Sequence, residues 1–172
     1  MKKLVAVVLW CLGVFAAIHL TNKFTHIEEN IMAIAESTLS FITNEEGFRN
    51  KAYKDSKGLL TIGVGHLIKD SEQHLVNATL TDEQVKELLR SDLRWCSEAV
   101  ESSVKVSLTQ RQYDALYSLC FNIGETNFKK STVVKKINEK DYQGAADAIL
   151  MWNKPEVLVK RRQRERALFL GA

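Results

Sequence analysis

The chain has 172 residues, of which 45% are hydrophobic and 26% are charged, and its length suits one domain with a substantial core. These proportions exclude a disordered chain, a collagen-like fibre and a polytopic membrane protein, and three cysteines are too few for a disulfide-stapled miniprotein. The net charge of +3 lies entirely in residues 1–26, and the neutral remainder argues against a nucleic-acid partner, which usually requires a basic face.

The first predicted element is a hydrophobic segment behind two N-terminal lysines. Lys2 and Lys3 precede the uncharged stretch 4–22, whose most apolar part is LVAVVLWCLGVFAAI. A membrane-spanning helix needs about 20 apolar residues, so residues 4–20 form a marginal span. The flanking lysines predict an N-terminus in the cytoplasm and a C-terminus across the membrane.

Three interpretations of this segment compete: a cleaved signal peptide, a permanent anchor, and a weak anchor that later leaves the bilayer. No clean Ala-x-Ala cleavage site follows the apolar stretch, which favours an uncleaved anchor, and its marginal hydrophobicity favours one that can be released. We therefore divide the chain into a signal-anchor segment with its linker, residues 1–26, and a catalytic domain, residues 27–172.

The domain begins with a predicted helix and a small sheet. Apolar residues at helical spacing predict a helix from Ile31 to Ile42 that ends near residues 43–46. Residues 47–66 (GFRNKAYKDSKGLLTIGVGH) alternate β-prone pieces with turn residues. They predict a small antiparallel sheet with turns at 55–58 and 63–65.

Helices are predicted for the rest of the chain. Two Thr-x-x-Gln capping boxes, which begin at Thr81 and Thr109, mark helix starts. The predicted helices span 81–102, 109–124, a segment near Ser131, 142–153 and 157–170. The resulting fold class is α+β, mainly α, with a small N-terminal antiparallel sheet lobe joined by a long helix to a helical C-terminal lobe.

Residues 46–66 hold the candidate chemistry. Glu46 lies at a predicted helix end, Asp55 in a turn and Thr61 on a predicted strand. Two carboxyls that flank a groove suit glycosidic hydrolysis, because one protonates the leaving oxygen while the other activates a water or attacks the sugar. A threonine hydroxyl can hold that water. Acidic pairs in loops are mostly solvated, so the spacing alone favours plain surface charges.

The pattern nevertheless resembles phage-type lysozymes (endolysins) of glycoside hydrolase family 24. Glu46, Asp55 and Thr61 stand at spacings of nine and six residues, and Thr61 opens the sequence TIGVGH. Further matching pieces follow in the same order, over about residues 31–170: FNIGETNF at 121–128, Trp152 and the closing VKRRQRERALFL.

This resemblance implies a lysozyme-like fold and an enzyme that breaks the β-1,4 bond between N-acetylmuramic acid and N-acetylglucosamine in peptidoglycan. Glu46 corresponds to the general acid, Asp55 to the carboxylate that assists water attack, and Thr61 to the residue that positions the water. The family uses no metal or cofactor. It usually inverts the sugar, which implies carboxyls about 6.5–9.5 Å apart.

Other positions match with less specific roles. The resemblance implies substrate binding by Leu67, Phe121 and Ser131, and a buried structural ion pair between His66 and Asp92. A general-base role for His66 is the weaker alternative. The four histidines show no metal-ligand spacing, and Trp95 and Trp152 are interpreted as core residues.

The C-terminal run KRRQRER, residues 160–166, is interpreted mainly as a solvated helix face. One of its arginines, Arg161 or Arg162, is expected to pair with Glu46. The remaining positive charges would attract the anionic cell wall.

The N-terminus resembles the signal-arrest-release subgroup of endolysins, which are held inactive at the membrane until the weak anchor leaves it. The expected location is therefore the host inner membrane, with the C-terminal domain in the periplasm and later release. Cys96 and Cys120 are interpreted as reduced core residues, and a role for Cys11 in thiol exchange stays open. Without a long apolar heptad repeat, a monomer is expected.

Three rival functions stay open. A lytic transglycosylase would need the acid but not a water-activating carboxylate, and Asp55 and Thr61 argue against it. A wall-binding module that has lost catalysis would not need the intact triad. A secreted lysozyme with a cleaved signal would differ only in its N-terminus.

Overall fold

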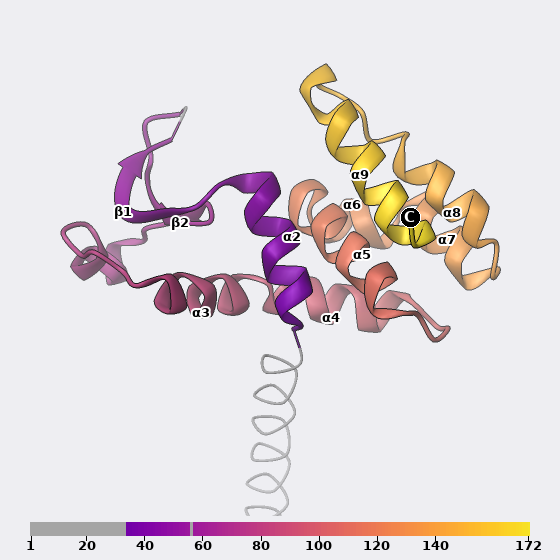
Figure 1. Ribbon diagram of the computed structural model, residues 1–172, viewed down its shortest axis with the longest axis horizontal. Coiled ribbons are helices and arrows are strands. Elements are labelled where there is room, and N and C mark those ends of the chain that lie inside the picture. Colours follow the sequence, from indigo (N-terminus) through magenta and orange to yellow (C-terminus); the bar gives the residue numbers. More distant parts are fainter. Residues whose placement is uncertain (1–33, 56) are drawn as a thin grey trace, which may run out of the picture. The chain divides into compact units, whose positions relative to one another are not determined.

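The computed structural model describes residues 34–55 and 57–172. The predicted signal-anchor segment lies outside these residues. Among the residues described, no helix is both long and apolar enough to span a bilayer. Figure 1 shows a small sheet at one side of the domain and a group of helices at the other, with α3 and α4 running between them.

The sheet has three antiparallel strands in the order β1-β2-β3: β1 (Arg49–Lys54), β2 (Leu60–Gly63) and β3 (His66–Leu67). This confirms the predicted sheet and both of its turns. Between the paired positions Arg49–Gly63 and Tyr53–Thr61, β1 advances four residues while β2 advances two. Such an irregularity bends the longer strand, so the hairpin curves as it leaves α2.

The helices follow the predicted order with different limits. They are listed here with two short 3₁₀ helices: α2 (Glu36–Glu46), η1 (Asp70–Leu75), α3 (Asp82–Asp92), α4 (Arg94–Ser103), α5 (Gln110–Ile123), α6 (Glu125–Lys129), α7 (Thr132–Asn138), α8 (Tyr142–Ile149), η2 (Glu156–Leu158) and α9 (Val159–Leu170). The capping boxes at Thr81 and Thr109 are both formed, with Gln84 and Gln112 as their partners.

The structure corrects two predicted helices. α2 begins at Glu36, because Ala35 before it is extended with ψ 151°, and the predicted start at Ile31 lies outside the described residues. The predicted long helix is two helices, α3 and α4, because the backbone at Leu93 has ψ −5° where a regular helix has about −42°. Leu93 is fully buried at this joint, so the break lies inside the core rather than at the surface.

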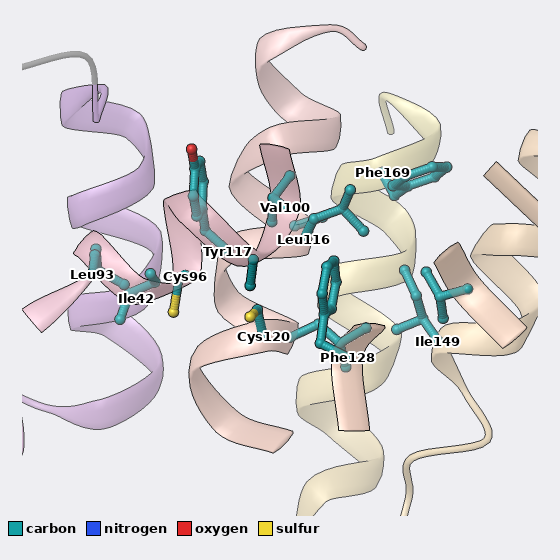
Figure 2. Close-up of a cluster of buried hydrophobic side chains, with 14 of the residues drawn as sticks. Ile42, Leu93, Cys96, Val100, Leu116, Tyr117, Cys120, Phe128, Ile149 and Phe169 are labelled. Carbon is teal, nitrogen blue, oxygen red and sulfur yellow. The ribbon is translucent and has the colours of Figure 1, made fainter. Parts of the chain in front are cut away.

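The core surrounds α5. Seven consecutive residues of this helix, from Asp114 to Cys120, are buried, which means that neighbours cover it on all sides. Figure 2 shows Leu116 and Cys120 of α5 among Phe128, Ile149 and other apolar side chains. Because α5 is held in this way, polar groups on its surface have fixed positions toward α2 and α9.

Candidate active site

Glu46 is the last residue of α2, and the chain leaves the helix directly after it. Gly47 has φ +87°, a backbone conformation that residues other than glycine rarely adopt. Its N–H donates to the carbonyl of Thr43. Phe48 then packs against the core. The sequence Glu-Gly-Phe thus ends the helix and fixes the carboxyl at the edge of the domain.

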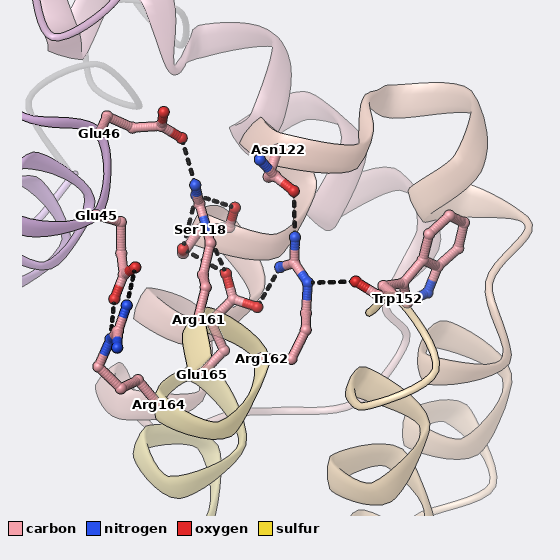
Figure 3. A network of polar contacts seen from close by, with 9 residues as sticks. All are labelled: Glu45, Glu46, Ser118, Asn122, Trp152, Arg161, Arg162, Arg164 and Glu165. Carbon is pink, nitrogen blue, oxygen red and sulfur yellow. Dashed lines mark hydrogen bonds and ion pairs between the residues drawn. The ribbon is translucent and has the colours of Figure 1, made fainter. Parts of the chain in front are cut away.

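The carboxyl of Glu46 contacts a buried guanidinium. Nη1 of Arg161 lies 2.6 Å from Oε1 of Glu46, and the two side chains are 6% and 27% exposed. Figure 3 shows Arg161 reaching from α9 toward Glu46, while Arg162 points to Asn122 and the carbonyl of Trp152. Of the two arginines considered from the sequence, Arg161 forms the pair.

Asp55 and Thr61 are connected through one residue of the hairpin. The carboxylate of Asp55 accepts the N–H groups of Lys57 and Leu59, each at 2.8 Å. Thr61, which is buried on β2, donates its hydroxyl to the carbonyl of Leu59 at 3.1 Å. The turn that follows β1 therefore determines the positions of both side chains.

A cavity of about 190 Å³ contains two of the predicted substrate-binding residues. It is lined by Gly65, His66, Leu67, Lys69, Asp92, Trp95 and Phe121. Leu67 is 47% exposed, and the rings of Trp95 and Phe121 stack with centroids 6.3 Å apart. Trp95 packs partly against the core, as interpreted. It also lines this cavity, and its position at helical spacing among apolar residues gave no indication of that second role.

Ser131 lies apart from this cavity. It is buried, and its hydroxyl accepts the N–H of Val134 at 3.2 Å as the N-cap of α7. The hydroxyl thus has a structural partner, and its expected substrate role stays a prediction.

His66 lies between two carboxylates. Its Nδ1 is 2.9 Å from Asp92, and its Nε2 is 3.2 Å from Glu72. Burial raises the pKa of Asp92 although the bond to His66 opposes this, and the backbone N–H of Lys69 lowers the pKa of Glu72. Both ring nitrogens of His66 are occupied, which favours the structural interpretation over a general base.

The C-terminal run differs from its predicted character as a solvated face. Arg161, Arg162 and Glu165 are buried; Arg161 is the expected partner of Glu46, and the interpretation as a solvated face was wrong for Arg162 and Glu165. These three residues pair with one another and with polar groups of α5, which offsets the cost of burying charge. Arg164 is half-exposed and forms a bidentate pair with Glu45.

Known proteins resemble this chain over most of its length. The family model described as phage lysozyme matches residues 43–165. An endolysin of Salmonella phage P22 is 50% identical over 146 residues, which cover 82% of this chain and all of the relative. A SAR-endolysin of Bacteriophage PS119 is 36% identical, over 73% of this chain and 76% of the relative.

The crystal structure of a point mutant of P22 lysozyme has the same fold. It superimposes with a TM-score of 0.74 at 49% sequence identity and covers 79% of this chain and 97% of that one. The expected lysozyme-like architecture, with a small sheet beside a helical lobe, is thereby confirmed.

Proposed function

The chain belongs to the phage lysozyme family, and on that basis we propose that Glu46, Asp55 and Thr61 catalyse its reaction. As a glycoside hydrolase of this family, the protein is an endolysin that degrades peptidoglycan and serves host-cell lysis. The bond cleaved is the β-1,4 linkage between N-acetylmuramic acid and N-acetylglucosamine.

Glu46 is the proposed general acid. Its proton passes to the leaving glycosidic oxygen as the bond from that oxygen to the anomeric carbon breaks. The glutamate becomes ionised in this step, and Nη1 of Arg161 lies 2.6 Å away to stabilise the developing charge. This fixed cation beside a partly exposed carboxyl is the observation that carries the proposal.

Asp55 and Thr61 act on the attacking water. Thr61 holds the water. The oxygen of this water forms a bond to the anomeric carbon, and Asp55 accepts the proton that the water releases. Their shared link through Leu59 supports this division of labour, because one turn sets the distance between the two side chains.

We propose that the cavity beside the sheet binds part of the glycan strand. Leu67 and Phe121 offer apolar surface there, and Trp95 extends it. Sugar rings pack well on such faces, while Lys69 supplies a positive charge for an anionic group of the wall.

We also propose that residues 4–20 tether the chain to the inner membrane, with the catalytic domain in the periplasm, and that the anchor is released later. The basic and then hydrophobic order of these residues supports this topology. The resemblance to SAR-endolysins supports release. The active species is proposed to be a monomer.

The test of the catalytic proposal is a single substitution in the full chain. We expect Glu46→Gln to lower the cleavage rate by a factor of about 10²–10⁴ or more, because an amide is too weak an acid to protonate the leaving oxygen. The fold should survive, because glutamine has nearly the same shape and Arg161 keeps its other partners. Cleavage is measured on purified peptidoglycan, with the products identified by mass spectrometry.

Glu45→Gln is the matched control, since Glu45 precedes Glu46 and pairs with a different arginine of α9. Hydrated reducing-end muramic sugars from the wild type and the control, but not from Glu46→Gln, support the proposal. Anhydro-muramic products would identify a transglycosylase. Binding without cleavage by the wild type would identify a wall-binding module.

A further inference from the structure

A cluster of buried charges lies behind the Arg161–Glu46 pair. Arg162 and Glu165 are fully buried, and Arg161 is 5% exposed. Burying charged groups is costly unless they are paired and hydrogen-bonded, so their arrangement is tightly constrained.

Glu165 is the anion at the centre of this cluster. Its Oε1 accepts from Nε of Arg161 at 3.0 Å and from the hydroxyl of Ser118 at 2.7 Å. Its Oε2 accepts from Nη1 of Arg162. Figure 3 shows these bonds on one side of Arg161 and the bond to Glu46 on the other.

Ser118 completes the support of Arg161. The Nη2 group of Arg161 donates to both the carbonyl and the hydroxyl of Ser118, each at 3.2 Å. With Nε on Glu165 and Nη2 on Ser118, the plane of the guanidinium is fixed. Nη1 is thereby aimed at the carboxyl of Glu46.

The charges of the cluster do not cancel. Two guanidinium groups face one buried carboxylate, so the three side chains together carry +1. Burial opposes the charge on Arg161, but Glu46 and Glu165 outweigh that effect and raise the pKa of the guanidinium. Arg161 therefore stays charged, and its guanidinium donates hydrogen bonds to both Glu46 and Glu165.

We infer that Glu165 is a positioning residue for the acid: it orients Arg161 toward Glu46 and offsets part of the positive charge that Glu46 faces. An acid needs a proton before cleavage and a stabilised negative charge after it, so the pull of Arg161 must be neither absent nor too strong. This inference rests on the proposed role of Glu46 as general acid.

Other charged groups around α2 are engaged elsewhere. On α9, Arg164 binds Glu45. On α3, Lys86 and Arg90 bind Glu36 at the opposite end of α2. On α5, Asp114 accepts bonds from Thr38 and Gln110. In the part of the chain that the structure describes, Glu165 is thus the other charged side chain bonded to Arg161 besides Glu46.

The test measures how kcat/KM on soluble glycan strands depends on pH in three variants of the full chain. The alkaline limb of this profile, where kcat/KM falls as the pH rises, reports loss of the acid's proton. Glu165→Gln raises the cluster charge to +2, and we expect the limb to move to lower pH by about one unit. Arg162→Met lowers the charge to zero and should move the limb to higher pH.

The double variant, Arg162→Met with Glu165→Gln, restores +1 and should restore the wild-type limb. It also keeps the protein testable if Glu165→Gln alone unfolds, because removing both members of a buried pair is tolerated better than removing one. The glutamine oxygen can still accept from Arg161 and Ser118.

Asp147→Asn serves as the control and should leave the limb in place, since the Asp147 side chain is 54% exposed and pairs with Arg166, a different arginine of α9. A purely structural role for Glu165 would lower the thermal unfolding midpoint without moving the limb. An unmoved limb in folded single variants overturns the inference if Glu46→Gln is inactive. An active Glu46→Gln would instead refute the proposed function itself.

Discussion

At the scale of single residues, Arg161 is the side chain that connects the described structure to the proposed chemistry at Glu46. It comes from the last helix, 115 positions away from Glu46 in sequence, and it is buried and bonded to Ser118 of α5 and Glu165 of α9. A cation held so firmly would not have to move as Glu46, the proposed acid, loses its proton. That is the advantage of a preorganised charge over water.

The two buried thiols give a separate test at this scale. Cys96 of α4 and Cys120 of α5 are free and fully buried, and Figure 2 shows both within the core. Burial is the main cause that raises the pKa of the Cys96 thiol, and the neighbouring Cys120 raises it further. In a Cys11→Ser chain, we expect neither thiol to react with a disulfide reagent until the protein unfolds. Rapid labelling in native buffer would contradict this packing.

The sequence predicted the local structure around Glu46, Asp55 and Thr61 better than it predicted their bonding partners. Glu46, Asp55 and Thr61 lie in one short segment, where spacing and turn residues are informative. The arginine that pairs with Glu46 could not be chosen, because Arg161 and Arg162 point about 100° apart on a helix. Only the packing of α9 on α5 decides which of them faces α2. The burial of Glu165 depends on the same packing.

At the scale of elements, helix starts were easier to predict than breaks within helices. The capping boxes at Thr81 and Thr109 are local, since each side chain bonds a backbone group three residues away. The break at Leu93 has no such signal, because the segment 81–103 contains neither proline nor glycine. Leu93 is buried where α3 meets α4, so tertiary packing sets the bend.

The cap of α8 gives a prediction about pH. Asp141 accepts from Lys136 and from the N–H of Gly144, each at 2.8 Å, and these bonds lower the pKa of its carboxyl below 3.8. A lowered pKa means that the stabilisation is present above the unfolded value and is lost as pH falls through the folded value. Asp141→Asn should therefore cost stability near neutral pH, and the difference should shrink below about pH 4.

Urea unfolding of the wild type and Asp141→Asn between pH 7 and pH 3 measures this difference. Lys136→Gln is the companion variant, since it removes the larger cause of the shift and leaves the bond from Gly144. Its dependence on pH should be weaker than that of the wild type. A gap between the wild type and Asp141→Asn that stays constant over the whole range would show that the carboxylate charge contributes nothing.

At the scale of the whole molecule, the site depends on contacts between distant parts of the chain. Two adjacent glutamates at the end of α2 each bind an arginine of α9, Glu46 to Arg161 and Glu45 to Arg164. The fold class followed from periodicity and turn residues, which are local. The cavity beside β3, where α3 meets α4 and α5 adds Phe121, could not be predicted without the family resemblance, because its residues come from three separate segments.

The N-terminal segment determines where the whole molecule would act, and its weak hydrophobicity can be tested directly. Residues 4–20 include a glycine and three alanines, each less favourable in a bilayer than leucine. We expect the full chain to fractionate first with inner membranes and later with the soluble periplasm. Gly13→Leu with Ala16→Leu should delay that release, because the segment then approaches an ordinary span.

Immunoblots of both fractions at intervals after induction measure the release, and N-terminal sequencing of the soluble form reads its first residue. Val5→Ile is the control, since it changes the segment without a large gain in hydrophobicity. If the Leu variant leaves the membrane as fast as the wild type, weak hydrophobicity does not govern release. A soluble form that begins beyond the apolar stretch would identify a cleaved signal instead, because an anchor that leaves the bilayer intact keeps Lys2 and Lys3.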